Sequence, residues 1–158
     1  MKFDTTSIEK IRQRLSDEKE ILGVAESVTA GFLQAALASA EGASEFFEGG
    51  ITTYNIDQKV HHLGIDRKLG EACNCVSEEV AKQMAMGAVN LFSCTWSIAV
   101  TGYATPVEES DFSVFAWYAI NKKDRTLKTS KILLKDLKGE DAQLAYVNAI
   151  LAEFSNLL

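Results

Sequence analysis

Apolar side chains recur along the chain at two spacings, one typical of helices and the other of buried strands. Near the amino-terminal end, Ile8, Ile11 and Leu15 are three and four residues apart, which predicts an amphipathic helix. Glu9 follows Thr6 by three residues, which is the spacing of a capping box at the start of this helix. The last 15 residues repeat the three-and-four spacing and predict a second amphipathic helix that closes the chain.

Between these two helices, short apolar runs bounded by polar residues predict buried strands. The last two runs are separated only by a polar turn, predicted at 121–125, so we expect them to pair as an antiparallel hairpin. The predicted strands are 21–27, 49–55, 97–102, 113–120 and 127–134.

Helical patterns occupy most of the segments between the predicted strands. An alanine-rich run favours a helix over 30–40, and Ser77 followed by two glutamates predicts the start of a long helix. The other predicted helical segments are 57–63, a short turn from Ser44 to Phe47, and a loop with some helical character at 66–76.

Strands that alternate with helices and end in a hairpin and a closing helix predict an α/β fold. We expect a three-layer α/β/α sandwich with a mixed β-sheet. The 158 residues are 47% hydrophobic and 24% charged, which is ordinary for a globular protein of one domain, here residues 1–158.

Charge and cysteine usage narrow the set of partners. The chain has 16 Lys and Arg against 22 Asp and Glu, a net charge of −6, which disfavours nucleic acid and anionic membranes as partners. No window approaches the length of a membrane span, and the charged amino terminus does not resemble a signal peptide. Three cysteines, Cys73, Cys75 and Cys94, do not make a disulfide scaffold, so we expect free thiols and a cytoplasmic protein. The aromatic residues fit either a core or a subunit interface, so a homo-oligomer is an open alternative.

The segment AESVTAG, from Ala25 to Gly31, joins a predicted strand to a predicted helix. Backbone N–H groups at such a helix start attract negative charge, and small residues let a substrate approach them. On this interpretation Ser27 is a candidate nucleophile, and Thr29, Ala30 and Gly31 bind the substrate or an oxyanion. The alternative is that Ser27 and Thr29 cap the helix and have no other role.

Two further segments, TYNIDQK and VTGYATP, follow the ends of other predicted strands. Ligand sites of α/β sheets lie at the carboxyl ends of strands, so Tyr54, Lys59, Thr101 and Gly102 are candidate site residues. A lysine in a poorly solvated cleft has a lowered pKa and can act as a general base toward a hydroxyl group. The alternative is that Lys59 is a solvated helix lysine and Tyr54 an aromatic residue at a rim.

Together, AESVTAG, GGITTYNIDQKVHHLGI, VSEEVAKQMAMGA and VTGYATP resemble the CinA carboxy-terminal domain family, whose stand-alone members are nicotinamide-mononucleotide amidohydrolases. The resemblance implies α/β/α layers, a serine nucleophile at Ser27, a lysine at Lys59 and an assisting tyrosine at Tyr54. It further implies hydrolysis of the carboxamide of nicotinamide mononucleotide, or a related small-molecule amide, in pyridine nucleotide salvage. It implies no metal and no cofactor.

The chain departs from the family pattern where a phosphate would be bound. Val28 and Ala30 stand where the family usually has cysteine and glycine, and GYATPVEESD replaces a glycine-rich loop. This loop carries Glu108, Glu109 and Asp111, and the run GEDAQLAYVN lacks the arginines usual there. These losses leave three alternatives: a nicotinamide-mononucleotide amidohydrolase, a hydrolase of another small amide, or a catalytically degenerate binding or assembly module.

Overall fold

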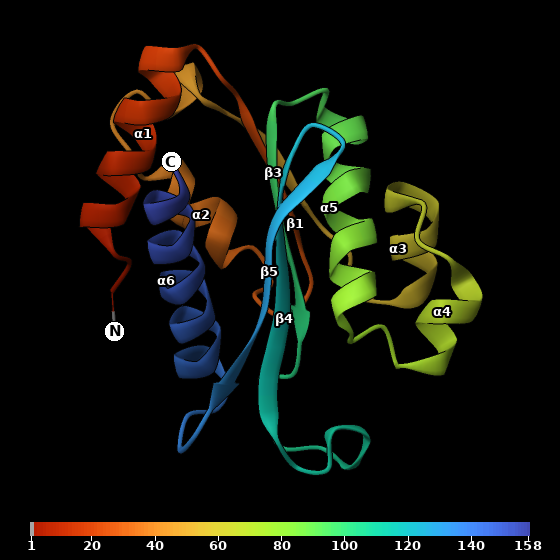
Figure 1. The fold of residues 1–158 in the computed structure, drawn as a ribbon. Helices are drawn as coiled ribbons and strands as arrows, with labels where there is room; N and C mark the ends of the chain where they lie inside the picture. Colours follow the sequence, from red (N-terminus) through yellow and green to blue (C-terminus); the bar gives the residue numbers. More distant parts are fainter. Residues whose placement is uncertain (1) are drawn as a thin grey trace.

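The computed structural model describes residues 2–158 and contains one mixed β-sheet. Its strands are β1 (Leu22–Glu26), β2 (Phe47–Thr52), β3 (Trp96–Gly102), β4 (Val114–Lys122) and β5 (Arg125–Leu134). Their order is β2-β1-β3-β4-β5 (Figure 1). β1 pairs in parallel with β2 and β3, whereas β3–β4 and β4–β5 are antiparallel pairs. The predicted mixed sheet with a terminal hairpin is therefore confirmed.

Helices cover both faces of this sheet (Figure 1). One face carries α1 (Thr5–Glu18), α2 (Phe32–Ala38) and α6 (Glu140–Leu157). The helices on the side of the other face are α3 (Ile56–Leu63), α4 (Arg67–Ala72) and α5 (Glu78–Phe92). Two 3₁₀ turns, η1 (Ala43–Glu45) and η2 (Glu108–Ser110), lie in the connections. This arrangement confirms the predicted three-layer α/β/α sandwich.

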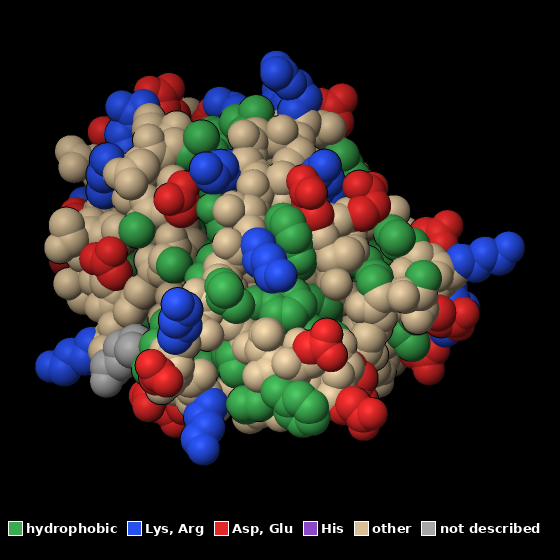
Figure 2. All heavy atoms as spheres, turned by 60° about the horizontal axis from the view of Figure 1, so that its bottom comes forward, with side chains coloured by type: hydrophobic (Ala, Val, Ile, Leu, Met, Phe, Trp, Pro, Cys, Tyr) green, Lys and Arg blue, Asp and Glu red, His purple; other side chains and the backbone are tan. Residues whose placement is uncertain are grey.

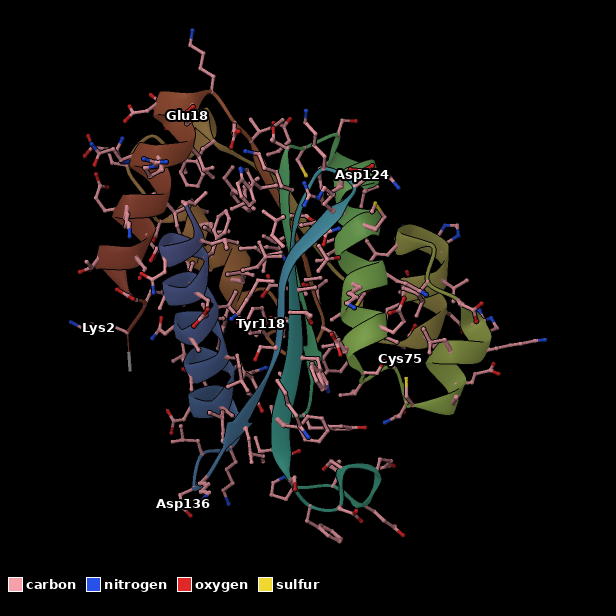
Figure 3. The ribbon with its side chains drawn as sticks, viewed as in Figure 1. Lys2, Glu18, Cys75, Tyr118, Asp124 and Asp136 are labelled. Atoms are coloured by element: carbon pink, nitrogen blue, oxygen red, sulfur yellow. The ribbon has the colours of Figure 1, made fainter. Side chains whose placement is uncertain are left out.

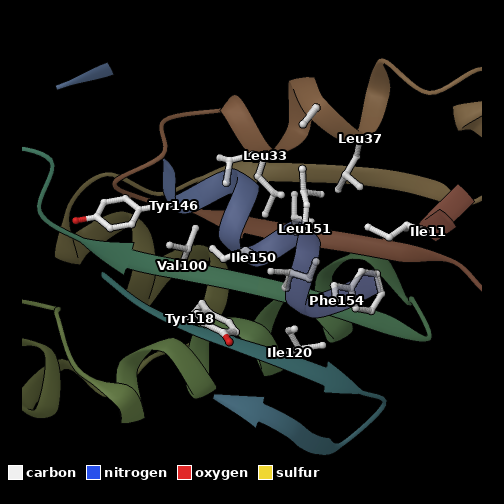
Figure 4. Close-up of a cluster of buried hydrophobic side chains, with 14 of the residues drawn as sticks. Ile11, Leu33, Leu37, Val100, Tyr118, Ile120, Tyr146, Ile150, Leu151 and Phe154 are labelled. Atoms are coloured by element: carbon white, nitrogen blue, oxygen red, sulfur yellow. The ribbon is translucent and has the colours of Figure 1, made fainter. Parts of the chain in front are cut away.

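Apolar side chains fill the space on both sides of the sheet. All five residues of β1 are buried, as expected for a central parallel strand that is covered on both faces. The larger cluster lies between the sheet and α1, α2 and α6, and Figure 4 shows part of it around Leu151 and Phe154. A smaller cluster around Met84 and Leu63 joins α5 and α3 to the opposite face.

Several predicted boundaries are wrong. The side chain that caps α1 belongs to Asp4, whose carboxylate accepts the Ser7 amide at 3.1 Å, and not to Thr6. The β4–β5 turn contains only Lys123 and Asp124, because Lys122 still pairs with Arg125. Figure 3 shows Asp124 at the end of the sheet opposite to Asp136.

Local sequence also misplaced two shorter segments. Phe47 begins β2 instead of ending a helical turn, because the strand register pairs it with Leu22. The segment 66–76 contains α4, whose start is capped by Asp66 through the Leu69 amide at 2.9 Å. α4 packs beside α3 and thereby borders the carboxyl ends of the central strands (Figure 1).

The close approach of α3 to α5 depends on Gly87. A Cβ atom built at Gly87 would lie 2.3 Å from the carbonyl oxygen and 2.7 Å from the Cα atom of Leu63, near the end of α3. Backbone atoms cannot rotate away as a flexible side chain can, so any larger residue must push the two helices apart. Gly87 therefore fixes the position of α3 relative to the sheet.

We expect Gly87→Ala to lower the free energy of unfolding. Helix propensity alone would favour alanine by about 1 kcal/mol. Overpacking costs about 1–3 kcal/mol, and we expect a cost at the upper end of this range because the added methyl group meets backbone atoms. A net loss of about 2 kcal/mol should appear in urea unfolding followed by circular dichroism. Asn90→Ala, at an exposed position of the same helix, is the control; a Gly87→Ala protein at least as stable as wild type would contradict the prediction.

Candidate functional site

The carboxyl ends of β1, β2 and β3 open onto a cavity of about 750 Å³. β1 leads into α2 on one face of the sheet, whereas β2 leads through α3, α4 and α5 on the other face to β3. Such a reversal leaves a crevice at the strand ends, which is where open α/β sheets bind ligands. Of the residues singled out in the sequence, the structure brings five to this cavity: Ser27, Tyr54, Lys59, Thr101 and Gly102.

Ser27 and Lys59 are in direct contact at the bottom of the cavity. Lys59 Nζ donates a hydrogen bond to Ser27 Oγ at 2.9 Å and another to the carbonyl oxygen of Thr53 at 2.7 Å. Lys59 is only 2% exposed, so the alternative of a solvated helix lysine is wrong. Ser27 is 8% exposed and is held by its own amide, which donates to the Val100 carbonyl at 3.1 Å.

The environment of Lys59 favours the neutral amine. Burial lowers the pKa of Lys59, because the ammonium form loses its hydration. None of the ion pairs formed by residues 2–158 involves Lys59. The charge of the Cys75 thiolate would act in the opposite direction on the pKa of Lys59, but burial raises the pKa of that thiol and so favours its neutral form. Figure 3 shows Cys75 beside α5. A buried amine without a partner carboxylate is a suitable proton acceptor.

Glu26 caps α2 from inside the protein. Its fully buried carboxylate accepts hydrogen bonds from the Leu33 amide at 2.8 Å and from the Gln34 amide at 3.0 Å. It also accepts the Thr29 hydroxyl at 2.6 Å and the Gln34 side-chain amide at 2.8 Å. The interpretation of Ser27 and Thr29 as the caps of this helix is therefore wrong. The N–H groups of the first turn are engaged by a carboxylate of the protein.

The three candidate binding residues after the nucleophile do not line the cavity. Thr29 is fully buried against Glu26, and Ala30 and Gly31 form the turn into α2 with φ angles of +51° and +103°. The cavity wall includes Val28 instead. Thr101 and Gly102 do line the cavity, although the Thr101 hydroxyl donates to the Cys75 carbonyl at 2.6 Å. A binding role for these five candidates stays a prediction.

Tyr54 lies at the rim of the cavity and is 72% exposed. Within residues 2–158 its hydroxyl forms no hydrogen bond to Lys59, whose second bond goes to the Thr53 carbonyl instead. The assisting role of Tyr54 therefore stays a prediction. Sequence reasoning missed Glu26, although an acidic residue near the end of a predicted strand and directly before a candidate nucleophile was a usable signal. It also missed the Thr53 carbonyl, for which the sequence contains no signal.

The acidic loop after β3 contributes to the cavity only through its first residues. Tyr103, Ala104 and Thr105 line the cavity, whereas the acidic residues form the η2 turn and its end. Figure 1 shows this loop projecting beyond the end of the sheet. The acidic side chains of this loop, Glu108, Glu109 and Asp111, therefore do not line the cavity.

Comparison with known proteins agrees with this architecture. The family model described as the CinA C-terminal domain matches residues 4–158. The chain belongs to the CinA C-terminal domain family. Among solved structures, this CinA domain is similar to a competence or damage-inducible protein of Enterobacter asburiae, with 27% identity, a TM-score of 0.91 and 99% of each chain covered. It is also similar to a CinA superfamily protein of Escherichia coli, with 30% identity, a TM-score of 0.91 and coverage of 100% and 94%.

Curated relatives of this CinA domain are longer proteins. A CinA-like protein of Prochlorococcus marinus is 43% identical over 105 residues, which are 66% of this chain and 25% of that protein. A CinA-like protein of Synechocystis is 34% identical over 129 residues, 80% of this chain and 31% of that protein. The matched segments thus make up about a quarter to a third of the length of these relatives.

Residues 2–158 show neither a membrane-spanning helix nor a cluster of metal ligands. No helix combines the length and apolar character that crossing a bilayer requires. Within the same residues, no three His, Cys, Asp or Glu side chains are grouped as a metal site would need. Figure 2, which looks toward the end of the CinA domain where the central strands finish, shows acidic side chains interspersed among the basic ones.

We expect Glu26→Gln to destabilise the CinA domain. One carboxylate oxygen would be replaced by an NH₂ group that faces N–H or O–H donors, so buried donors would lose their acceptor at a cost of about 1–3 kcal/mol. Urea unfolding measures the loss, with Glu48→Gln, an exposed position on β2, as the control. Equal stabilities of the two variants would argue against the capping role of Glu26.

Proposed function

We propose that this CinA domain hydrolyses a primary carboxamide, of nicotinamide mononucleotide or a related small amide, with Ser27 as nucleophile and Lys59 as general base. One observation carries the proposal: the 2.9 Å contact between Ser27 Oγ and a buried Lys59 Nζ at the bottom of an open cavity. A hydroxyl with a low-pKa amine within hydrogen-bonding distance is the arrangement required for nucleophilic catalysis. The cavity also supports an enzyme over a degenerate module, because it leaves room for a substrate.

In the first step, Ser27 Oγ attacks the carboxamide carbon while its proton passes to the neutral Lys59 Nζ. The resulting tetrahedral intermediate carries a negative charge on the former carbonyl oxygen. The intermediate then collapses as Lys59 gives the proton to the leaving nitrogen, so that ammonia departs and an acyl ester of Ser27 remains. The Thr53 carbonyl holds the amine toward the hydroxyl throughout.

A backbone amide directly after Ser27 is suited to stabilise the oxyanion. Among the hydrogen bonds of residues 2–158, none uses the amide of Val28 or Thr29, whereas the Ala30 amide donates to the Ser27 carbonyl. Free amides directly after a nucleophile are typical oxyanion donors, and removal of one such donor commonly costs about 10²–10³ in rate. We therefore assign the oxyanion site to the Val28 amide, because Val28 lines the cavity whereas Thr29 is fully buried.

The second step regenerates the enzyme. Water attacks the acyl ester while Lys59 accepts its proton, and the same proton returns to Ser27 Oγ as the carboxylic acid leaves. The sum of both steps is amide plus water giving acid plus ammonia. Applied to nicotinamide mononucleotide, the products are nicotinate mononucleotide and ammonia, the reaction that the family resemblance implies.

Ammonia release from nicotinamide mononucleotide, nicotinamide riboside and nicotinamide tests the proposal. We expect Ser27→Ala and Lys59→Met to lower the rate by about 10³-fold or more, each by a similar factor because the two residues act as a unit. Lys68→Met, at an exposed position of α4, is the matched control and should keep wild-type activity. Unchanged rates in folded Ser27→Ala would refute the mechanism; circular dichroism and thermal unfolding establish that each variant is folded.

The pH dependence gives a second test, because only the neutral amine accepts a proton. We expect kcat/KM to rise about tenfold per pH unit on the acid side and to level off below the ordinary lysine pKa of about 10.4.

The lowered pKa of Lys59 also predicts a pH dependence of stability. Between the folded-state and unfolded-state pKa values of Lys59, the folded state binds fewer protons than the unfolded state, so the free energy of unfolding rises with pH in that window. Lys59→Met should remove this rise in unfolding experiments; a rise of equal size in that variant would contradict the assignment.

A further inference from the structure

The wall of the catalytic cavity carries little positive charge. Among residues 2–158, the cavity is lined by one cationic side chain, Lys59, and by one carboxylate, Glu71. Lys59 is buried and already bonded to Ser27 and Thr53. Glu71 is exposed near the end of α4 and free to face a ligand. The remaining lining residues are uncharged, so the cavity offers a substrate one free carboxylate and no free cation.

The one backbone feature that favours an anion is offset by nearby carboxylates. Gly139, at the start of α6, lines the cavity, and helix starts attract negative charge. Glu140 and Asp141 occupy the first turn of this helix and are exposed. Lys138 precedes Gly139 in sequence but lines a neighbouring cavity. A phosphate at the start of α6 would therefore meet two carboxylates and no arginine.

The rim provides surfaces suited to a flat cation. Tyr54 and Tyr103 both line the cavity, and the exposed ring of Tyr54 leaves its face free for stacking. Tyr103 is held in place, because its hydroxyl accepts the Asn74 side-chain amide at 3.2 Å and its ring packs edge-on against Phe115. Aromatic faces attract cations, and a pyridinium ring is both flat and cationic.

These observations extend the proposed function and rest on it. We infer that the preferred substrate of this CinA domain is a pyridinium carboxamide without a phosphate group, such as nicotinamide riboside, recognised through the carboxylate of Glu71 and the tyrosine rim. The carboxamide lies at Ser27 and is hydrolysed by the steps given above. The positive ring is directed toward Glu71, and the unphosphorylated sugar avoids the carboxylates at the start of α6.

The test compares kcat/KM for ammonia release from nicotinamide riboside, nicotinamide mononucleotide and uncharged nicotinamide. We expect the riboside to exceed the mononucleotide by about tenfold or more, with a smaller difference at high salt because the repulsion is screened. Glu71→Gln should lower the value for the riboside by about 2- to 5-fold, the size typical of an exposed charge pair. Glu71→Lys should lower it further and raise the value for the mononucleotide.

Glu41→Gln is the matched control, because it removes the same charge at an exposed position outside the cavity. A mononucleotide preference in the wild type overturns the inference while it supports the proposed amidohydrolase. Riboside preference that responds to Glu71→Gln no more than to Glu41→Gln overturns the role of Glu71. Absence of ammonia release from all three amides by folded wild-type protein refutes the proposed function itself, and the inference with it.

Discussion

The burial of Lys59 without a partner carboxylate is the constraint on which the arrangement of the site depends. Burying an isolated ammonium group costs free energy, so burial favours the neutral amine of Lys59 and requires hydrogen-bond acceptors for its N–H groups. Its two hydrogen-bond partners come from different strands, Ser27 after β1 and Thr53 after β2. The Thr53 amide donates in turn to the Glu26 carbonyl at 2.9 Å. The parallel β1–β2 ladder thus extends directly to the contact between Ser27 and Lys59.

The carboxylate of Glu26 forms a second hydrogen-bond network, which engages the start of α2 and is separate from the contact between Ser27 and Lys59. Glu26 occupies the α2 amides that would otherwise attract an anion, and it leaves the amides of Val28 and Thr29 free beside Ser27. The turn that follows requires a left-handed backbone at Ala30, where an alanine is less favourable than glycine. In the proposed mechanism, the oxyanion is therefore bound at the turn and not at the start of α2.

Sequence predicted the fold more completely than the site. The three-layer sandwich follows from hydrophobic periodicity, which reflects burial directly. The β4–β5 turn was placed too widely because Asn121 is polar yet fully buried, a tertiary effect that local pattern does not record. Family resemblance implied roles for Lys59 and Ser27 but not their contact, because 32 residues separate them and periodicity carries no such distance. Glu26 was missed because its capping role depends on tertiary hydrogen bonds with amides seven and eight residues further along the chain.

The location of charge within the fold changes the meaning of the net charge of −6. In sequence, Glu108 and Glu109 fall where the family resemblance implies a glycine-rich loop, but in the structure they lie on η2 and do not line the cavity. The charge that does reach the cavity comes from Glu71 on α4, a helix that the sequence pattern predicted only as a loop with some helical character. Coulomb interactions fall off with distance and are screened in water within about 10 Å at 0.1 M salt. Charges in the cavity wall therefore affect the binding of a charged substrate more strongly than the net charge of the chain does. The inferred selection against phosphate therefore rests on the lining of the cavity, and arginines at the start of α6 would reverse the expected preference even in an acidic protein.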